Sequence, residues 1–201
     1  MAPTPSFQPI ILAGEHVELR PLSPDHAEGL RAAVAEGELW TLWYTAIPSP
    51  DEMDGEIARR LRLQDAGSMV PFTVVERPSG RIVGMTTYMN IDAAGPRVEI
   101  GSTWYGQSVQ RSPLNTEAKL LLLSHAFDTL GCLAVEFRTH FFNQQSRRAI
   151  ERLGAKLDGI LRHHMRAKNG TLRDTCVYSI VAPEWPTVRA HLNAKLGRGG
   201  A

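Results

Sequence analysis

Arg111, Ser112 and Pro113 are residues whose types and order could hold an anion. Ser is a preferred N-cap residue and Pro is favoured at the first helical position, so the triplet predicts that a helix begins there. The free N–H groups and the positive dipole end of such a helix attract negative charge. Arg111 adds a full positive charge beside them. This chemistry favours the phosphate of a cofactor or nucleotide.

The segments around the triplet predict the elements that position it. Residues 99–105 resemble a strand, 106–113 a polar loop, and 114–130 a long buried helix that Gly131 ends. Residues 134–140 alternate in polarity and predict a strand, which the helical crossover makes parallel to its predecessor. A helix that directly follows a strand points its free N–H groups beyond the tip of that strand.

The rest of the chain predicts an α+β fold with a mixed sheet and no internal repeat. We expect a single domain over 9–196, between flexible tails at 1–8 and 197–201. Ser-Pro pairs start two early helices, and Gly-containing turns separate most of the strands. The further strands are expected over 10–12, 16–20, 72–76, 81–89, 157–165 and 175–181, and the further helices over 24–35, 50–66, 143–153 and 183–196.

Composition excludes several classes of protein. The chain has 201 residues, of which 43% are hydrophobic and 21% are charged, as is usual for a globular protein. A net charge of +1 provides no basic field, so we expect no nucleic-acid partner. No apolar run approaches the roughly 20 residues that span a membrane, so we expect no membrane partner and a cytoplasmic location. Cys132 and Cys176 are too few for a thiolate metal site, and we expect no metal.

Two passages resemble those of a known family. The first is Glu99-Ile-Gly, followed downstream by Thr116-Glu117-Ala118. The second is the segment 143–154, which begins Asn-Gln-Gln-Ser and ends Leu-Gly. Both are similar to segments of the GNAT superfamily of N-acetyltransferases, in particular the branch of ribosomal-protein N-terminal acetyltransferases. The resemblance implies one GNAT-like domain with a sheet of about seven strands, splayed at a central βαβ crossover and flanked by four to five helices.

The resemblance also implies the cofactor, acetyl-CoA, in a gap between the strands that end near Trp104 and His140. The family's pyrophosphate loop runs Gln/Arg-x-x-Gly-x-Gly/Ala, but here Pro113 and Asn115 replace the two glycines. Pro contributes no N–H, so the loop departs from the family pattern. The residues implied to bind the cofactor are Ser102, Thr103, Trp104, Gln110, Arg111, Ser112, Leu114, Asn115, Asn143 and Ser146.

Glu99 and Ser146 are the expected catalytic residues. Glu99 would act as a general base through water, and its alternative role is that of a solvent-facing strand carboxylate. The Asn-x-x-Ser match implies that Ser146 protonates the leaving thiolate, and its alternative role is a first-turn hydroxyl that bonds backbone. Asn143 would contact the cofactor as well as serve as an N-cap. The usual superfamily acid, a Tyr in this helix, has no counterpart in 143–153.

An aromatic cluster and one histidine are the candidates for the acceptor site. Trp40, Trp43 and Tyr44 could form a wall over the gap, and their alternative is to fill the core under a helix pair. His140 ends a strand at the expected site and could be a base or a substrate contact. The basic run 59–62 is expected to be a solvated helix face.

These observations predict an acetyl-CoA-dependent N-acetyltransferase that uses direct attack in a ternary complex. The acceptor would be a primary amine, either a peptide N-terminus or a small molecule, and a homodimer is the commonest assembly for such proteins. The alternative is a non-catalytic acyl-CoA-binding or sensor protein on the same fold, which Pro113 favours and the pair Glu99 and Ser146 opposes. A nucleotide kinase is disfavoured because the chain has no Gly-x-x-x-x-Gly-Lys run.

Overall fold

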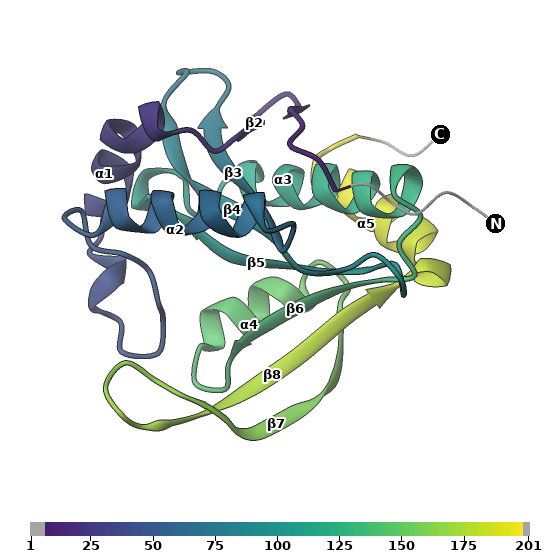
Figure 1. Cartoon of the computed structure of the whole chain (residues 1–201). Coiled ribbons are helices and arrows are strands. Elements are labelled where there is room, and N and C mark those ends of the chain that lie inside the picture. Colours follow the sequence, from purple (N-terminus) through teal and green to yellow (C-terminus); the bar gives the residue numbers. More distant parts are fainter. Residues whose placement is uncertain (1–6, 199–201) are drawn as a thin grey trace.

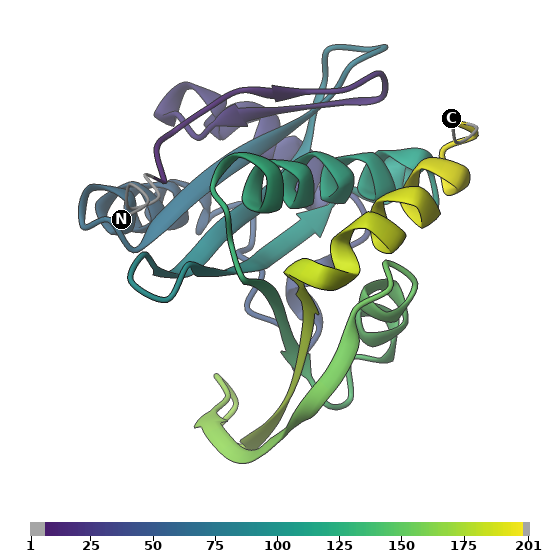
Figure 2. The same ribbon diagram turned by 90° about the vertical axis from the view of Figure 1, so that its right-hand side faces the viewer.

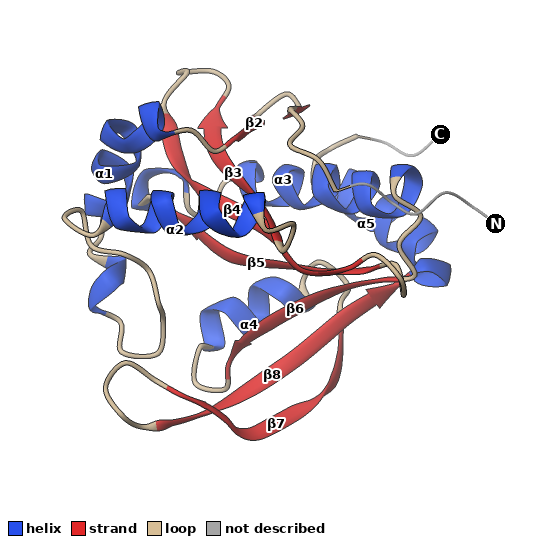
Figure 3. Cartoon of the chain, viewed as in Figure 1, coloured by secondary structure: helices blue, strands red, loops and turns tan. Residues whose placement is uncertain are grey.

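A mixed eight-stranded sheet forms the centre of the computed structural model, which describes residues 7–198 (Figures 1 and 3). Its strand order is β1-β2-β3-β4-β5-β6-β8-β7, and every neighbouring pair is antiparallel except β5 and β6. The predicted α+β fold is confirmed, with eight strands where the resemblance implies about seven, and the strand expected over 10–12 is the two-residue β1. The strands are β1 Leu12–Ala13, β2 Val17–Pro21, β3 Met69–Glu76, β4 Ile82–Asp92, β5 Arg97–Tyr105, β6 Ala134–His140, β7 Lys156–Arg166 and β8 Leu172–Val181.

Five α-helices in the described range cover the sheet unevenly. Helices α3, α4 and α5 lie on one face, and α1 and α2 lie on the other (Figure 2). Because α1 and α2 cover only the first half of the sheet, the part formed by β6, β8 and β7 is uncovered on their side. We call this uncovered part the open face. The helices are α1 Ala27–Ala35, α2 Met53–Asp65, α3 Pro113–Ser124, α4 Gln144–Glu151 and α5 Trp185–Lys195.

The long helix expected over 114–130 is present but changes its winding. Helix α3 ends at Ser124 and continues as a π-helical segment, His125–Thr129. Its apolar side packs into the main core beneath the sheet. A second core lies between α1, α2 and the opposite face of β4 and β5.

The ends of the described range lie close to the expected tails. Those tails, 1–8 and 197–201, fall largely outside residues 7–198. Phe7 packs against the main core, with its ring centroid 6.0 Å from that of Tyr88. No helix in the described range is long and apolar enough to cross a membrane.

Glu117 joins the central helix to the first strands and explains one part of the family-like sequence. Its buried carboxylate accepts backbone N–H groups from residues 15–17 at 2.9, 2.6 and 2.9 Å, and the Arg198 guanidinium also contacts it. A side chain at Gly14 would meet this carboxylate, since a Cβ there would lie 2.4 Å from Glu117 Cδ. A buried charge with four donors is a stable anchor, so Glu117 holds the start of β2 against α3.

The predicted splay of the sheet is present between β5 and β6. These two strands pair only where Arg97, Val98 and Glu99 face 134–136. Beyond Glu99 they diverge, as Figure 1 shows, so the β6-facing edge of β5 has no strand partner from residue 100 onward. An unpaired strand edge of this kind can accept a ligand that carries amide groups.

Candidate active site

The start of α3 has the cap that the Ser-Pro pair predicts. The Leu114 N–H donates to Ser112 Oγ at 3.3 Å, and Pro113 occupies the first turn. Ser112 in turn donates to the Val109 carbonyl at 2.7 Å. Gln110 Nε2 donates to the Tyr105 carbonyl at 3.1 Å, so the side chain of Gln110 braces the loop from within. The predicted helix start is confirmed, and it lies next to the end of β5.

Arg111 stands in this loop in the left-handed region, with φ at 61°. The residue is exposed, and its side chain makes no ion pair or hydrogen bond within residues 7–198. A left-handed non-Gly residue is sparsely populated and costs about 1 kcal/mol or more, and such residues are enriched at ligand sites. The loop therefore presents a free guanidinium beside the N-terminus of α3, where the family has flexible glycines.

Arg111→Ala should weaken the binding of acetyl-CoA about tenfold, because it removes a charge-assisted contact to the phosphates. Isothermal titration calorimetry with acetyl-CoA would measure this change. Arg62→Ala is the matched control, since Arg62 is also exposed but lies on α2. Equal affinities for the two variants would show that Arg111 does not bind the cofactor.

The three cofactor residues expected on β5 lie at a bulge. Met85 pairs with Trp104 and Thr87 with Gly101, so β5 has one extra residue at this point. Ser102 is the exposed, left-handed residue of the bulge, with φ at 48°. The Trp104 side chain is buried in the core under α1 and α2. What this segment can offer a ligand is therefore mainly its backbone, as expected.

Thr103 turns its side chain to α3 and meets a buried lysine that the sequence analysis missed. Thr103 Oγ1 lies 2.8 Å from Thr86 Oγ1 and 3.3 Å from Lys119 Nζ. Burial lowers the pKa of Lys119 to about 7. The ammonium also lies 5.9 Å from the centroid of the Tyr105 ring. These contacts fix the far side of the bulge to α3.

Arg60 corrects the expectation that 59–62 is a solvated helix face. Its side chain is 2% exposed and donates to Glu56 Oε1 at 2.7 Å and to Thr87 Oγ1 at 2.6 Å. Its Nη2 donates to the Ser102 carbonyl at 3.3 Å. The wrong expectation came from counting charges, because residue 60 follows Met53 and Ile57 at helical spacing on the buried side of α2. Arg60 thus holds the bulge of β5 from the opposite face of the sheet.

Helix α4 presents Asn143 and Ser146 at its first turn. Asn143 Oδ1 accepts the Ser146 N–H at 3.0 Å, so Asn143 is an N-cap, as its alternative role predicts. Ser146 is half-buried. The buried Tyr178 of β8 fixes the helix, because its hydroxyl accepts from Arg147 Nε at 3.0 Å and donates to Glu151 at 2.9 Å. The position of the Ser146 hydroxyl is therefore set by a rigid turn.

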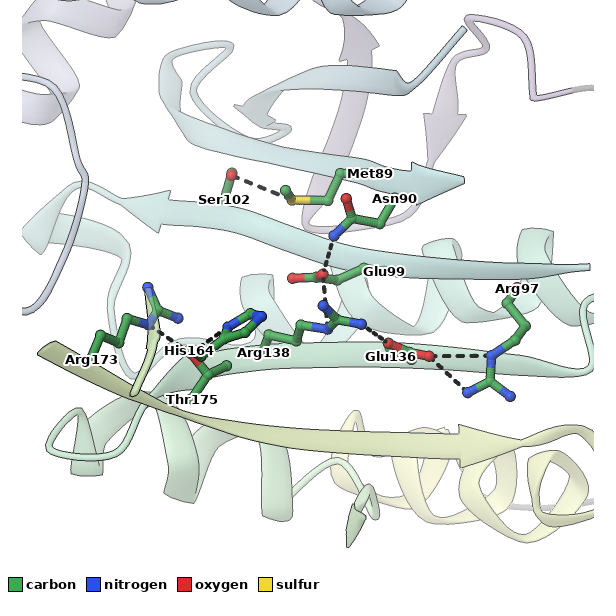
Figure 4. A network of polar contacts seen from close by, with 10 residues as sticks. All are labelled: Met89, Asn90, Arg97, Glu99, Ser102, Glu136, Arg138, His164, Arg173 and Thr175. Carbon is green, nitrogen blue, oxygen red and sulfur yellow. Dashed lines mark hydrogen bonds and ion pairs between the residues drawn. The ribbon is translucent and has the colours of Figure 1, made fainter. Parts of the chain in front are cut away.

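Glu99 lies at the point where β5 and β6 part, and it is not solvent-facing. It is 5% exposed, accepts from Asn90 Nδ2 at 2.7 Å and lies 3.5 Å from Arg138 Nε (Figure 4). Burial raises the pKa of its carboxyl above the ordinary value, against the opposing effects of Asn90 and Arg138. Arg138 also bonds Glu136 at 2.9 Å. A buried carboxylate with a raised pKa is suited to accept a proton near neutral pH.

His140 lies on the same side of β6 as Arg138 and is enclosed by aromatic rings. Its centroid is 5.1 Å from that of Trp43, 6.3 Å from Tyr44 and 5.8 Å from Phe142. The Phe142 N–H donates to Nδ1 at 3.1 Å, so the neutral ring carries its proton on Nε2, which is buried without a partner in the described structure. Burial, and then the charge of Arg173, lower the pKa of His140. A neutral imidazole that donates from Nε2 is better suited to contact a substrate than to act as a base.

The expected aromatic wall is divided in two. The rings of Trp43 and Tyr44 lie against His140, and their role as a wall of the acceptor site stays a prediction. Trp40 instead packs against the core under α1 and α2.

Asn90, Arg138 and Arg173 were not named from the sequence, because their strands carry no motif and only the sheet register brings them beside Glu99. A cavity of about 300 Å³ opens beside Arg138, lined by Arg97, Glu136, Arg138, Asp158, Gly159, Leu161 and Val177.

The residues present fit a coenzyme A thioester. The unpaired edge of β5 can bond the amides of its pantetheine arm, as an added strand would. Arg111 and the N-terminus of α3 supply positive charge for its phosphates. The first turn of α4 borders the same gap between β5 and β6 (Figure 1). No group of three or more His, Cys, Asp or Glu side chains in the described range could hold a metal ion.

Comparison with known proteins agrees with this site. Residues 16–156 match the family described as "Acetyltransferase (GNAT) domain". The crystal structure of a GCN5-related N-acetyltransferase from Brucella melitensis is 33% identical, with a TM-score of 0.85 over 96% of this chain and 89% of that chain. A Bacillus subtilis (strain 168) protein named "Putative ribosomal N-acetyltransferase YdaF" is 26% identical over 85% of this chain and 94% of its own length. Mycobacterium smegmatis RimJ, solved in complex with CoA-disulfide, has a TM-score of 0.80 at 21% identity, covering 96% of this chain and 97% of that chain, and shows the fold alone.

The splayed mixed sheet, with a helix capped at the gap, defines an acetyltransferase fold. The family match spans more than half of the chain, so the chain belongs to the GNAT acetyltransferase family. It is an N-acetyltransferase, and the cofactor of the family is acetyl-CoA. The resemblance inferred from Glu99-Ile-Gly and from 143–154 is thereby confirmed.

Proposed function

We propose that this protein transfers the acetyl group of acetyl-CoA directly to a primary amine in a ternary complex. The observation that carries the proposal is the buried carboxylate of Glu99, which lies at the mouth of the gap and has a raised pKa. When bound, acetyl-CoA supplies an acetyl group activated as a thioester. The acceptor is a peptide N-terminus or a small-molecule amine. The name of the Bacillus subtilis relative favours a ribosomal peptide N-terminus.

The cofactor half of the site holds and orients acetyl-CoA. In this proposal the backbone of 100–104 holds the pantetheine arm. The pantetheine arm and the phosphates are also held by the loop residues Gln110, Arg111, Ser112, Leu114 and Asn115. A backbone N–H at the Ser102 bulge polarises the thioester carbonyl, as an oxyanion hole does. Asn143 and Ser146 would close the other side of the gap. The Ser146 hydroxyl would donate a proton to the departing thiolate sulfur and regain one from the newly bonded amine, which has to lose a proton to become the amide.

The acceptor half of the site, on the open face, removes a proton from the acceptor amine. An ammonium with a pKa of about 8 to 10 must lose a proton before its nitrogen can attack. Glu99 accepts that proton, directly or through one water, and Arg138 stabilises the charged carboxylate. Trp43, Tyr44 and His140 form the wall against which the acceptor lies.

Thiol release from acetyl-CoA tests the proposal. We expect release with a peptide that has a free N-terminus or with a small amine, and none with the same peptide acetylated at its N-terminus. Ser146→Ala should lower kcat by roughly 10- to 100-fold, because the thiolate loses its acid, whereas the adjacent, exposed Gln145→Ala should not.

A parallel thermal-shift measurement distinguishes the alternatives. A rise in Tm with millimolar acetyl-CoA, together with no thiol release for any amine, would instead support a sensor that binds acyl-CoA without catalysis. No rise in Tm would contradict both readings, since a ligand that binds only the folded state must stabilise it.

A further inference from the structure

Arg173 is a half-buried cation on the open face that has no acidic partner within residues 7–198. Its Nε donates to Thr175 Oγ1 at 3.0 Å, and its two terminal amines donate to no group in that range. Burial lowers the pKa of Arg173, and the charge of Glu99 opposes this effect. A guanidinium held partly out of water without a counter-charge is costly, and such groups are typical of anion-binding sites.

The acids around Arg173 already have other partners. Each of them accepts at least one hydrogen bond or forms an ion pair elsewhere on the open face, as Figure 4 shows for two of them. No carboxylate of the described face therefore forms an ion pair or a hydrogen bond with Arg173, and Glu99 acts on it only through its charge. The pairs are Glu136 with Arg97 and Arg138, Glu99 with Asn90, Asp158 with Ser179, and Asp174 with the backbone N–H of His163.

The position of Arg173 links it to the proposed base. Its side chain lies back over Thr175, which pairs with His140 at the end of β6. Arg173 and Glu99 are close enough for the charge of each to affect the pKa of the other. The two side chains therefore lie on the same face of the sheet and within electrostatic range of each other.

The far part of the β7–β8 hairpin, residues 161–174, adds a wider positive field. It carries four cations and a single acid, although the whole chain has a net charge of only +1. The tip of this hairpin lies below the segment between α1 and α2 in Figure 1. Cations on one wall of a cleft attract an anionic substrate and raise its local concentration. The cations are Arg162, Arg166, Lys168 and Arg173, and the acid is Asp174.

We propose that the acceptor carries a carboxylate a few bonds from its amine, and that Arg173 binds this carboxylate while Glu99 takes the amine proton. The proposal rests on the proposed N-acetyltransferase function and names its substrate class. A guanidinium binds a carboxylate through two parallel hydrogen bonds, so Arg173 would fix both the position and the orientation of the acceptor. The carboxylate can belong to a small amino acid or to an acidic residue near a peptide N-terminus.

The test uses acceptor pairs that differ by one charge. The small pair is β-alanine and β-alaninamide, and the peptide pair is Ala-Glu-Ala-Ala amide and Ala-Gln-Ala-Ala amide. For the full chain we expect kcat/KM to favour the acid of at least one pair about tenfold. The pair that shows the preference identifies the source of the carboxylate.

Three variants show whether Arg173 produces this preference. Arg173→Gln should lower the acid-to-amide ratio about tenfold, and Arg173→Lys should lower it less because it keeps the charge. Arg162→Gln is the matched control, because it removes one charge of the same positive field from an 80% exposed side chain and should lower the acid-to-amide ratio far less than Arg173→Gln does. The amine pKa values within a pair affect every variant alike, so they cancel when the acid-to-amide ratios of two variants are compared.

Each outcome decides the proposal. An acid preference that Arg173→Gln removes and Arg162→Gln retains supports it. Equal kcat/KM for acid and amide in the unmodified chain, or a preference that survives Arg173→Gln, overturns it while leaving the transferase function intact. If no amine releases thiol, the transferase function fails, and calorimetry with the N-acetylated Glu and Gln peptides tests Arg173 without turnover.

Discussion

Glu99→Gln is expected to lower kcat on the order of 100-fold or more, because the variant cannot accept the proton of the attacking amine. The affinity for acetyl-CoA should stay unchanged, since Glu99 lies on the open face and the loop that we propose binds the phosphates lies at the start of α3. Stopped-flow thiol release together with calorimetry would measure the two quantities. The amide keeps the size of the side chain, so the loss would reflect its chemistry.

The pH profile of the same reaction reports the raised pKa of Glu99. The base must be deprotonated, so kcat/KM should fall as pH drops through a value above the ordinary 4.5. Arg138→Gln removes a cation 3.5 Å from Glu99, which should raise the pKa further and move this acid limb to higher pH.

Glu136→Gln is the control for Glu99, because Glu136 faces Glu99 across the β5–β6 register and contacts the same arginine. We expect it to retain activity within a few fold. Full activity of Glu99→Gln, or an equal loss in both variants, would contradict the role of Glu99 as the base.

Arg60→Ala is expected to lower the free energy of unfolding by about 3–5 kcal/mol, the range measured when one partner of a buried ion pair is removed. The buried Thr87 hydroxyl and the Ser102 carbonyl would lose their donor at the same time. Ser102 would then lose a contact that holds its left-handed backbone, so the KM for acetyl-CoA should rise as well. Urea denaturation and steady-state kinetics would measure the two effects.

Arg59→Ala provides a matched comparison for Arg60→Ala. Arg59 donates to the same Glu56 at 2.8 Å, but it is exposed and contacts neither β4 nor β5. An exposed pair contributes at most about 1 kcal/mol. Equal destabilisation by the two substitutions would mean that the contacts of Arg60 with Thr87 and Ser102 contribute nothing.

The local features of the site could be read from the sequence because they depend on near neighbours. Ser112-Pro113 specifies a helix start whatever surrounds it, and the structure has that cap. Asn143 likewise caps α4 through a residue three positions away. The alternation of polarity in 134–140 correctly predicted a strand, because one side of that strand is buried.

Features that depend on partners distant in the chain could not be predicted. Helical spacing with Met53 and Ile57 places Arg60 on the buried side of α2, but its partners on β4 and β5 are known only from the packing of α2 against the sheet. Trp40 and Trp43 are three residues apart, yet one packs into a core and the other reaches His140. The direction of the chain between α1 and α2 separates them, and no periodicity encodes that direction.

By itself, the sequence determined the helix caps, the order of strands and helices, the family, and Glu99 and Ser146 as the candidate catalytic residues. The tertiary structure decided the environment of those groups. It buried Glu99 between Asn90 and Arg138, and it left Arg173 without an ion-pair partner in the described range. The physical reason is range: capping and periodicity act over a few residues, whereas burial and charge balance depend on strands that meet only when the sheet forms.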